Sequence, residues 1–148
     1  MATSTLLQTL DADTNQMGVT ASNRRQVETF MANATIAAGD LLSLDLAQAA
    51  DADKALYVKV ADTGSDDTRC AVGVALHAAT AGEPVSAVIA GLVEAKVKAA
   101  TARGTRMAIY STPGILEPYQ ASFEDPIFAV TGAAESGGKA IVFVLKQF

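Results

Sequence analysis

The sequence has little of what disulfide frameworks and metal sites are built from. Its 148 residues include one cysteine, one histidine and no tryptophan. A single cysteine excludes an internal disulfide and any multi-cysteine zinc site, so we expect neither a metal nor a cofactor. Basic residues are also few, 11 against 16 acidic ones. We therefore expect no general attraction to phosphate backbones and no nucleic-acid partner.

Long apolar runs and aromatic residues are scarce too. The longest unbroken apolar run, Ala140 to Leu145, is far shorter than the roughly 20 residues of a membrane-spanning helix, so we expect no membrane partner. The first basic residue is Arg24, and a secretory leader with a positive start is not expected. Half of the residues are apolar, only 5% are aromatic, and about a fifth are alanine. This composition predicts one folded domain with a core of small side chains.

Residues 1–25 differ from the rest of the chain because they are mostly polar. Their scattered apolar side chains are Leu6, Leu7, Leu10, Met17 and Val19. The three leucines fit one short helical face, which is too little to hold a helix together in water. We interpret residues 1–25 as an extended arm that becomes ordered on a partner through these five side chains. A terminus without a role is the alternative.

From residue 26 onward the pattern is that of a β protein, so residues 26–148 are predicted to form a single β-rich domain. Short apolar runs, several with alternating polar residues, are separated by loops rich in Gly, Asp and Pro. Strands are predicted at 27–31, 42–46, 56–60, 71–78, 85–90, 93–99, 105–110, 127–130 and 140–145, with loops at 47–54, 62–68 and 111–124.

One region allows a second interpretation. Residues 92–103 also fit a helix that ends before Gly104, but Lys96 would then lie on its buried face, so we favour the strand. The spacing of the strands, with no long helix required, predicts a mainly β fold of the small β-barrel or β-sandwich type.

No catalytic motif is present. His77, the only histidine, is predicted at a strand end, and no motif supplies the nucleophile or carboxylate that a catalytic histidine needs. Asp62 and Arg106 are the only polar residues that could join it, so an enzyme or ligand-binding module on these three residues is one alternative. Cys70, next to Arg69, is either a reactive thiol or a small, partly buried hydrophobic residue, and we favour the second.

Two further ligand signals are weak. Asp11 to Asn15 looks like the start of a calcium loop, but Gln16 and Ser22 stand where that loop needs Gly and Glu. A nucleic-acid-binding barrel would need aromatic platforms in a basic groove. The available aromatic residues are Tyr110, Tyr119, Phe123 and Phe128, and only Arg103 and Arg106 lie near them in sequence.

The domain resembles a known viral family. A recurring segment of bacteriophage head decoration (capsid cement) proteins is similar to the block Cys70 to Lys98, which contains AVGVALHAATAGEPVSAVIAGLVEAKV. The stretches 27–30 and 36–45 also look like the opening of that family, and 139–148 is similar to its closing strand. The resemblance covers residues 26–148.

This resemblance implies a fold of the β-clip or β-tulip kind, no catalysis and assembly into a homotrimer. It further implies that the trimer binds the outer surface of the capsid in the virion, where it clamps adjacent subunits of the major capsid protein. The chain would pass through the host cytoplasm during assembly. Residues 1–25 would form the arm that is ordered on the capsid, although this arm is longer than in compact family members. A structural protein of the tail or of the head–tail connection remains an alternative.

Overall fold

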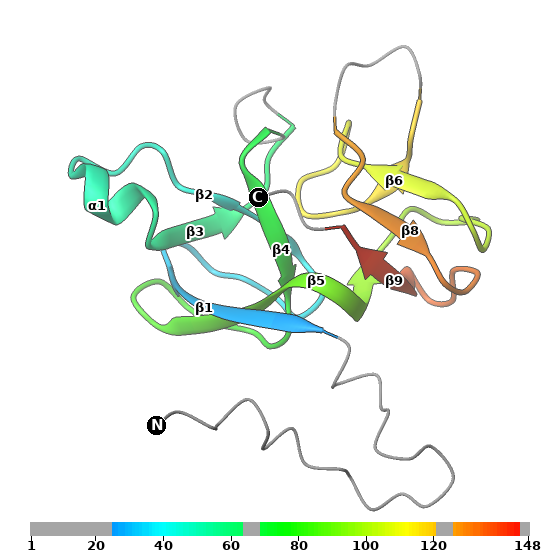
Figure 1. The fold of residues 1–148 in the computed structure, drawn as a ribbon, viewed down its shortest axis with the longest axis horizontal. Coiled ribbons are helices and arrows are strands. Elements are labelled where there is room, and N and C mark those ends of the chain that lie inside the picture. The colour runs from blue at the N-terminus through cyan, green and yellow to red at the C-terminus, as the bar shows by residue number, and fades with distance from the viewer. Residues whose placement is uncertain (1–24, 64–68, 121–125, 146–148) are drawn as a thin grey trace, which may run out of the picture.

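The computed structural model describes residues 25–63, 69–120 and 126–145. These residues form nine strands and one short helix (Figure 1). The elements are β1 (Gln26–Ala32), β2 (Leu41–Leu44), α1 (Asp51–Lys54), β3 (Tyr57–Val60), β4 (Ala71–Ala75), β5 (Pro84–Lys96), β6 (Arg106–Ala108), β7 (Glu117–Pro118), β8 (Ala129–Thr131) and β9 (Lys139–Val144). No described helix is both long and apolar enough to span a bilayer.

Five strands close into a barrel. They are hydrogen-bonded in the order β1-β3-β2-β4-β5, and β1 also pairs with β5, which closes the ring. The pairing of β1 with β3 is parallel, and the other four pairings are antiparallel. Closure removes the unpaired sheet edges on which strands of other molecules could add. The prediction of a mainly β barrel is confirmed.

A second sheet shares its first strand with the barrel. Its order is β5-β9-β8-β6-β7, with antiparallel pairing throughout. The first half of β5 pairs with β1 and β4, and the second half, from Gly91 to Lys96, pairs with β9. Figure 1 shows β5 passing from the barrel into this sheet. The strands predicted at 127–130 and 140–145 correspond to β8 and β9, which pair with each other.

The sequence prediction that β5 is interrupted at Gly91 was wrong. The strand runs through this position for 13 residues, and Gly91 has a φ of 102°. Side chains other than glycine rarely adopt this conformation, so glycine here permits a bend rather than a chain break. The strand interpretation of residues 92–96 is confirmed, because Val93, Ala95 and Val97 are buried as a period of two requires.

The buried apolar residues form two clusters, one inside the barrel and one between the barrel and the second sheet. One draws on all five barrel strands and fills the barrel; it consists of Phe30, Ala32, Ile36, Leu42, Val58, Val72, Ala75, Ala79, Val85 and Ala87. The other lies between the barrel wall and the second sheet and includes Leu41, Val74, Val88, Val93, Ala95, Met107, Phe128, Ala129 and Val142. Adjacent residues of one strand, such as Leu41 and Leu42, therefore enter different clusters.

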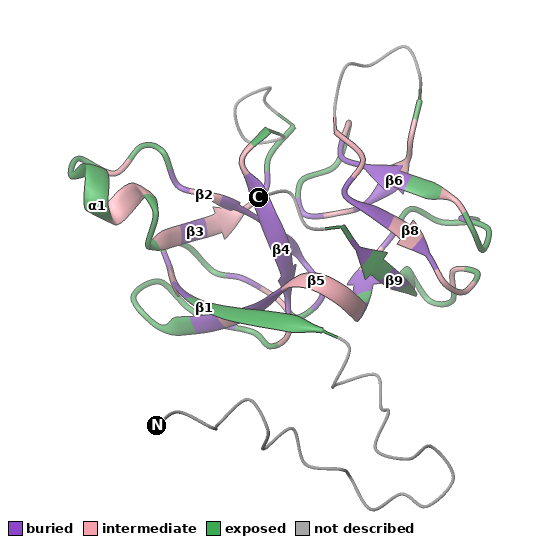
Figure 2. Cartoon of the chain, viewed as in Figure 1, coloured by how far each residue is buried: buried purple, intermediate pink, exposed green. Residues whose placement is uncertain are grey.

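Strand β4 is buried on both of its faces, as Figure 2 shows. Its residue Gly73 lies directly against the backbone of β5. A Cβ atom at this position would lie 2.4 Å from the carbonyl oxygen of Val88 and 2.9 Å from its carbonyl carbon. Both atoms belong to the backbone of a shared strand, so they cannot move aside cheaply. Glycine at position 73 is thus required by the closure of the barrel.

Three local predictions were wrong. Residues 47–54 were predicted as a loop, but they contain α1, a single turn that buries no side chain and so leaves no helical periodicity in the sequence. Residues 111–124 contain the short strand β7 within their predicted loop. Leu46 and Leu56, predicted inside strands, lie outside them and are exposed. Of the predicted arm only Arg25 lies within the described residues.

Replacing Gly73 by alanine should lower the free energy of unfolding by about 3 kcal/mol, because the new methyl group overpacks against the backbone of β5. Chemical denaturation followed by circular dichroism measures the loss. Gly82→Ala is the matched control: its φ is +86°, but no atom lies within 4 Å of the added Cβ, and it should cost about 1 kcal/mol. Equal losses in the two variants would contradict the steric explanation.

Candidate functional site

A buried carboxylate joins the barrel to the second sheet. Asp40 precedes β2 and is 7% exposed. Its Oδ1 accepts a hydrogen bond from the Lys96 ammonium at 2.7 Å, and its Oδ2 accepts one from the Ala37 amide at 2.8 Å. The amide of Lys96 also donates to the Gly39 carbonyl at 2.9 Å. Lys96 ends β5, so these contacts fix the second half of that strand against the turn before β2.

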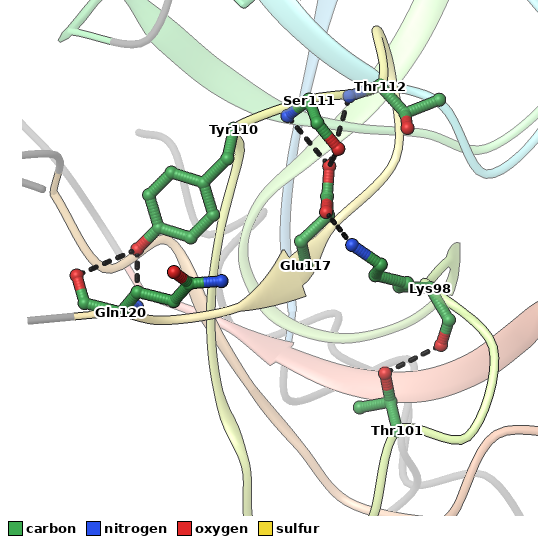
Figure 3. A network of polar contacts seen from close by, with 7 residues as sticks. All are labelled: Lys98, Thr101, Tyr110, Ser111, Thr112, Glu117 and Gln120. Atoms are coloured by element: carbon green, nitrogen blue, oxygen red, sulfur yellow. Dashed lines mark hydrogen bonds and ion pairs between the residues drawn. The ribbon is translucent and has the colours of Figure 1, made fainter. Parts of the chain in front are cut away.

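A second buried carboxylate organises the loops beside the second sheet (Figure 3). Glu117 of β7 is 2% exposed. Its Oε2 accepts from the Lys98 ammonium at 2.7 Å. Its Oε1 accepts from the amide and the hydroxyl of Ser111, at 2.8 and 2.7 Å, and from the Thr112 amide at 3.0 Å. Both carboxylate oxygens are thus occupied, and the contacts join three segments of the chain.

The protonation of Glu117 follows from these contacts. Burial by itself would raise the pKa of this carboxyl, but the hydrogen bonds from Lys98 and Ser111 and the charge of Lys98 outweigh it and lower the pKa below its ordinary value. A carboxylate with a lowered pKa stays ionised, so it can accept all of these hydrogen bonds at once. The arrangement holds Lys98 and the loop at Ser111 against β7.

The three residues of the catalytic alternative are not joined in the structure. His77 follows β4 and is exposed; its Nε2 accepts from the Ser86 amide at 3.1 Å. Asp62 follows β3, and its Oδ1 accepts from the Thr63 amide at 2.7 Å. Arg106 lies in β6, in the second sheet. No hydrogen bond or ion pair found among the described residues links any two of the three.

The remaining candidates also stand apart from one another. Cys70 is a free, half-buried thiol immediately before β4. Phe128 is 3% exposed and belongs to the core, so it offers no platform for a base. Within the described part of the chain, no three His, Cys, Asp or Glu side chains are placed to hold a metal ion. The calcium-like segment Asp11 to Asn15, Phe123 and the arm residues Leu6, Leu7, Leu10, Met17 and Val19 lie outside the described residues.

The second sheet carries an exposed apolar face that the sequence analysis missed. Along β9 and just beyond it, Ile141, Phe143 and Leu145 are 37%, 51% and 41% exposed. The register places Leu92 of β5 and Val130 of β8 on either side of Phe143. Cross-strand neighbours project on the same side of a sheet, so these five residues share one surface, which we call the apolar face. Figure 2 shows the exposure of β9.

A signal for this face is present in the sequence. The run Ala140 to Leu145 is apolar at every position, whereas a strand of an antiparallel sheet with one face in water usually alternates apolar and polar residues. Ala140, Val142 and Val144 are buried, so the apolar residues between them must face outward. The run alone does not reveal the face, because a strand buried on both sides has the same pattern.

Comparison with solved structures is informative about the fold, whereas comparison with sequences is not. No protein-family profile matches the chain, and no curated protein matches it. Its fold is similar to the crystal structure of the N base of the head fiber protein gp8.5 of bacteriophage phi29. The TM-score is 0.57, the sequence identity is 13%, and the match covers 83% of this chain and 95% of that chain. At this identity the likeness is one of fold.

Glu117→Gln should lower the free energy of unfolding by about 2 kcal/mol at neutral pH, because a charged hydrogen-bond acceptor is lost from a buried site. The folded-state pKa of Glu117 is lowered from 4.5. The stabilisation by its carboxylate is therefore complete above about pH 4.5 and disappears as the pH falls through the lower folded-state pKa. Urea denaturation at several pH values should show the difference between variant and wild type shrinking in acid.

Glu94→Gln is the control for this prediction. Glu94 also pairs with a lysine, Lys139, at 3.1 Å, but both side chains are about half exposed. Exposed pairs contribute little, so the loss should stay below about 0.5 kcal/mol. A deficit for Glu117→Gln that stays constant from neutral pH to pH 3 would contradict the assignment of a lowered pKa.

Proposed function

We propose that this chain is a structural protein of a bacteriophage head. It binds the outer surface of the capsid and stabilises it by clamping adjacent subunits of the major capsid protein. The observation that carries the proposal is the fold likeness to the N base of a phage head fiber protein, which extends over most of both chains. The resemblance of residues 26–148 to head decoration proteins supports the same role independently of that likeness.

The physical character of the domain agrees with this role. Asp40 fixes the end of β5, Glu117 fixes the loops beside the second sheet (Figure 3), and the apolar face lies on the surface of that sheet. An exposed apolar face of this kind is a common mark of a protein-binding surface. In this proposal residues 1–25 form the arm, and Leu6, Leu7, Leu10, Met17 and Val19 contact the capsid.

Capsid binding is tested with purified heads that lack this protein. We expect the full chain to occupy fixed sites over the head faces and to raise the temperature at which heads open. Deletion of residues 2–22 should leave a folded protein but reduce its occupancy at least tenfold, because the arms of one oligomer add their contacts through high effective concentration. Electron microscopy of the particles and gel quantitation of bound protein measure both.

A pair of triple variants separates side-chain contact from arm length. Replacing Leu6, Leu7 and Leu10 by serine should reduce occupancy as deletion does, whereas replacing Thr3, Ser4 and Thr5 by alanine should not. Full occupancy by the deleted chain would overturn the role of the arm. Density at a single vertex would favour the tail or head–tail alternative, and density that projects outward as a fibre would favour a head-fiber base, the role named for the structural neighbour.

We further propose that the protein is a homotrimer, the assembly that its resemblance to head decoration proteins implies. A core rich in alanine gains little per side chain, since one buried CH₂ contributes about 0.8 kcal/mol, and symmetric association buries further surface. Sedimentation equilibrium should give three times the chain mass of 15.2 kDa at micromolar concentration. A monomer at this concentration would contradict the proposal.

A further inference from the structure

The described chain begins beside the apolar face. Arg25 lines a pocket together with Glu94 and Lys139. Glu94 is the cross-strand partner of Ile141, and Lys139 opens β9 on the same side of the sheet as Ile141 and Phe143. Residues that precede Arg25 therefore start at the border of this face.

The apolar face has the features of an interaction site. Five apolar side chains on three neighbouring strands, with Phe143 half exposed at their centre, form a contiguous patch of the kind that usually marks an interaction site. The large exposed side chains elsewhere in the described residues, Val27, Leu46 and Leu56, lie on other elements or loops.

The first 24 residues have the composition and the length to cover the face. Their larger apolar side chains after Met1 are Leu6, Leu7, Leu10, Met17 and Val19, and Val19 lies six residues before Arg25. An extended chain reaches about 3.3 Å per residue, so Val19 has a range of about 20 Å from Arg25. The row from Ile141 to Leu145 spans only about 13 Å at the spacing of a β-strand.

Charge favours the same occupant. Arg106 is exposed and is the cross-strand neighbour of Val130, so it borders the apolar face on the side of β6. Asp11 and Asp13, the acidic residues of the first 24, lie between the leucines and Met17 in sequence. A tethered segment also has an effective concentration in the millimolar range, which exceeds that of any free partner at micromolar concentration.

We propose that, in the free protein, residues 6–19 of the same chain cover the apolar face formed by Leu92, Val130, Ile141, Phe143 and Leu145. This inference goes beyond the proposed function, because it concerns the protein before any capsid is bound and does not depend on capsid binding. In the proposed function the same residues contact the capsid, so the segment would have to leave the apolar face when the protein binds a head.

A paramagnetic label on the full chain tests the proposal. Cys70→Ser removes the native thiol, and Thr9→Cys accepts a nitroxide next to Leu10. We expect the methyl signals of Ile141 and Leu145 to lose more than half of their intensity. The methyl signals of Ala38, which also lines the pocket beside Arg25, and of Leu56 should lose much less. A segment that is merely tethered at Arg25 would weaken Ala38 as much as Ile141.

Two further samples sharpen the result. Phe143→Asp should restore the signals of Ile141 and Leu145 in the labelled chain, whereas Leu56→Asp, a change of an equally exposed side chain, should not. Isotope-labelled chains without nitroxide are then mixed, with subunit exchange, with an excess of nitroxide-bearing chains. In this mixture, the Ile141 and Leu145 methyl signals of the isotope-labelled chains should lose less than half of the intensity that they lose in chains that carry the nitroxide themselves.

A second measurement avoids the cysteine substitutions, in case Cys70→Ser or Thr9→Cys disturbs the fold. In the otherwise native chain, replacing Leu6, Leu7 and Leu10 by serine should shift the methyl signals of Ile141 and Leu145, and replacing Thr3, Ser4 and Thr5 by alanine should not. Unchanged signals in both variants would overturn the proposal. Strong signal loss in the mixed sample would assign the face to the segment of a second copy and overturn it as well.

Discussion

Strand β5 is the constraint on which the architecture depends. Its first half closes the barrel against β1 and β4, and its second half begins the sheet that continues through β9. The two layers therefore cannot move independently without breaking a continuous hydrogen-bonded strand. Gly91 lies where β5 passes from the barrel into the second sheet, and Gly73 allows β4 to approach β5 closely within the barrel.

The buried carboxylates of Asp40 and Glu117 tie further loops to the end of the shared strand β5. Asp40 holds Lys96 at the end of β5, and Glu117 holds Lys98 two residues later. The loops that carry the carboxylates are thereby tied to the part of the chain that leaves β5. Because an unpaired buried charge is costly, each pair disfavours positions of its loop in which the carboxylate would be buried without its lysine. The lowered pKa of Glu117 agrees with a carboxylate that stays ionised and bound.

The position of the two apolar clusters determines which face of the second sheet is exposed. One cluster lies inside the barrel and the other between the barrel and the second sheet. The inner face of the second sheet is thus covered, whereas Ile141, Phe143 and Leu145 on its outer side are partly exposed. The apolar side chains of β9 on that outer face contribute nothing to the interior, so their presence is best explained by contact with another segment or molecule. The proposed role on a phage head rests on the fold likeness to the N base of a head fiber protein.

The amino-acid sequence by itself determined that the domain is built from strands, roughly where most of them lie, and that its core is made of small side chains. These properties follow from local periodicity and composition, which a single segment carries. Only the tertiary structure decided that β5 is one strand shared by two layers, that Leu41 and Leu42 enter different clusters, and that Glu117 is buried beside Lys98. The physical reason is that these features depend on which strands pair and which face of each is covered, and residues far apart in the chain settle both.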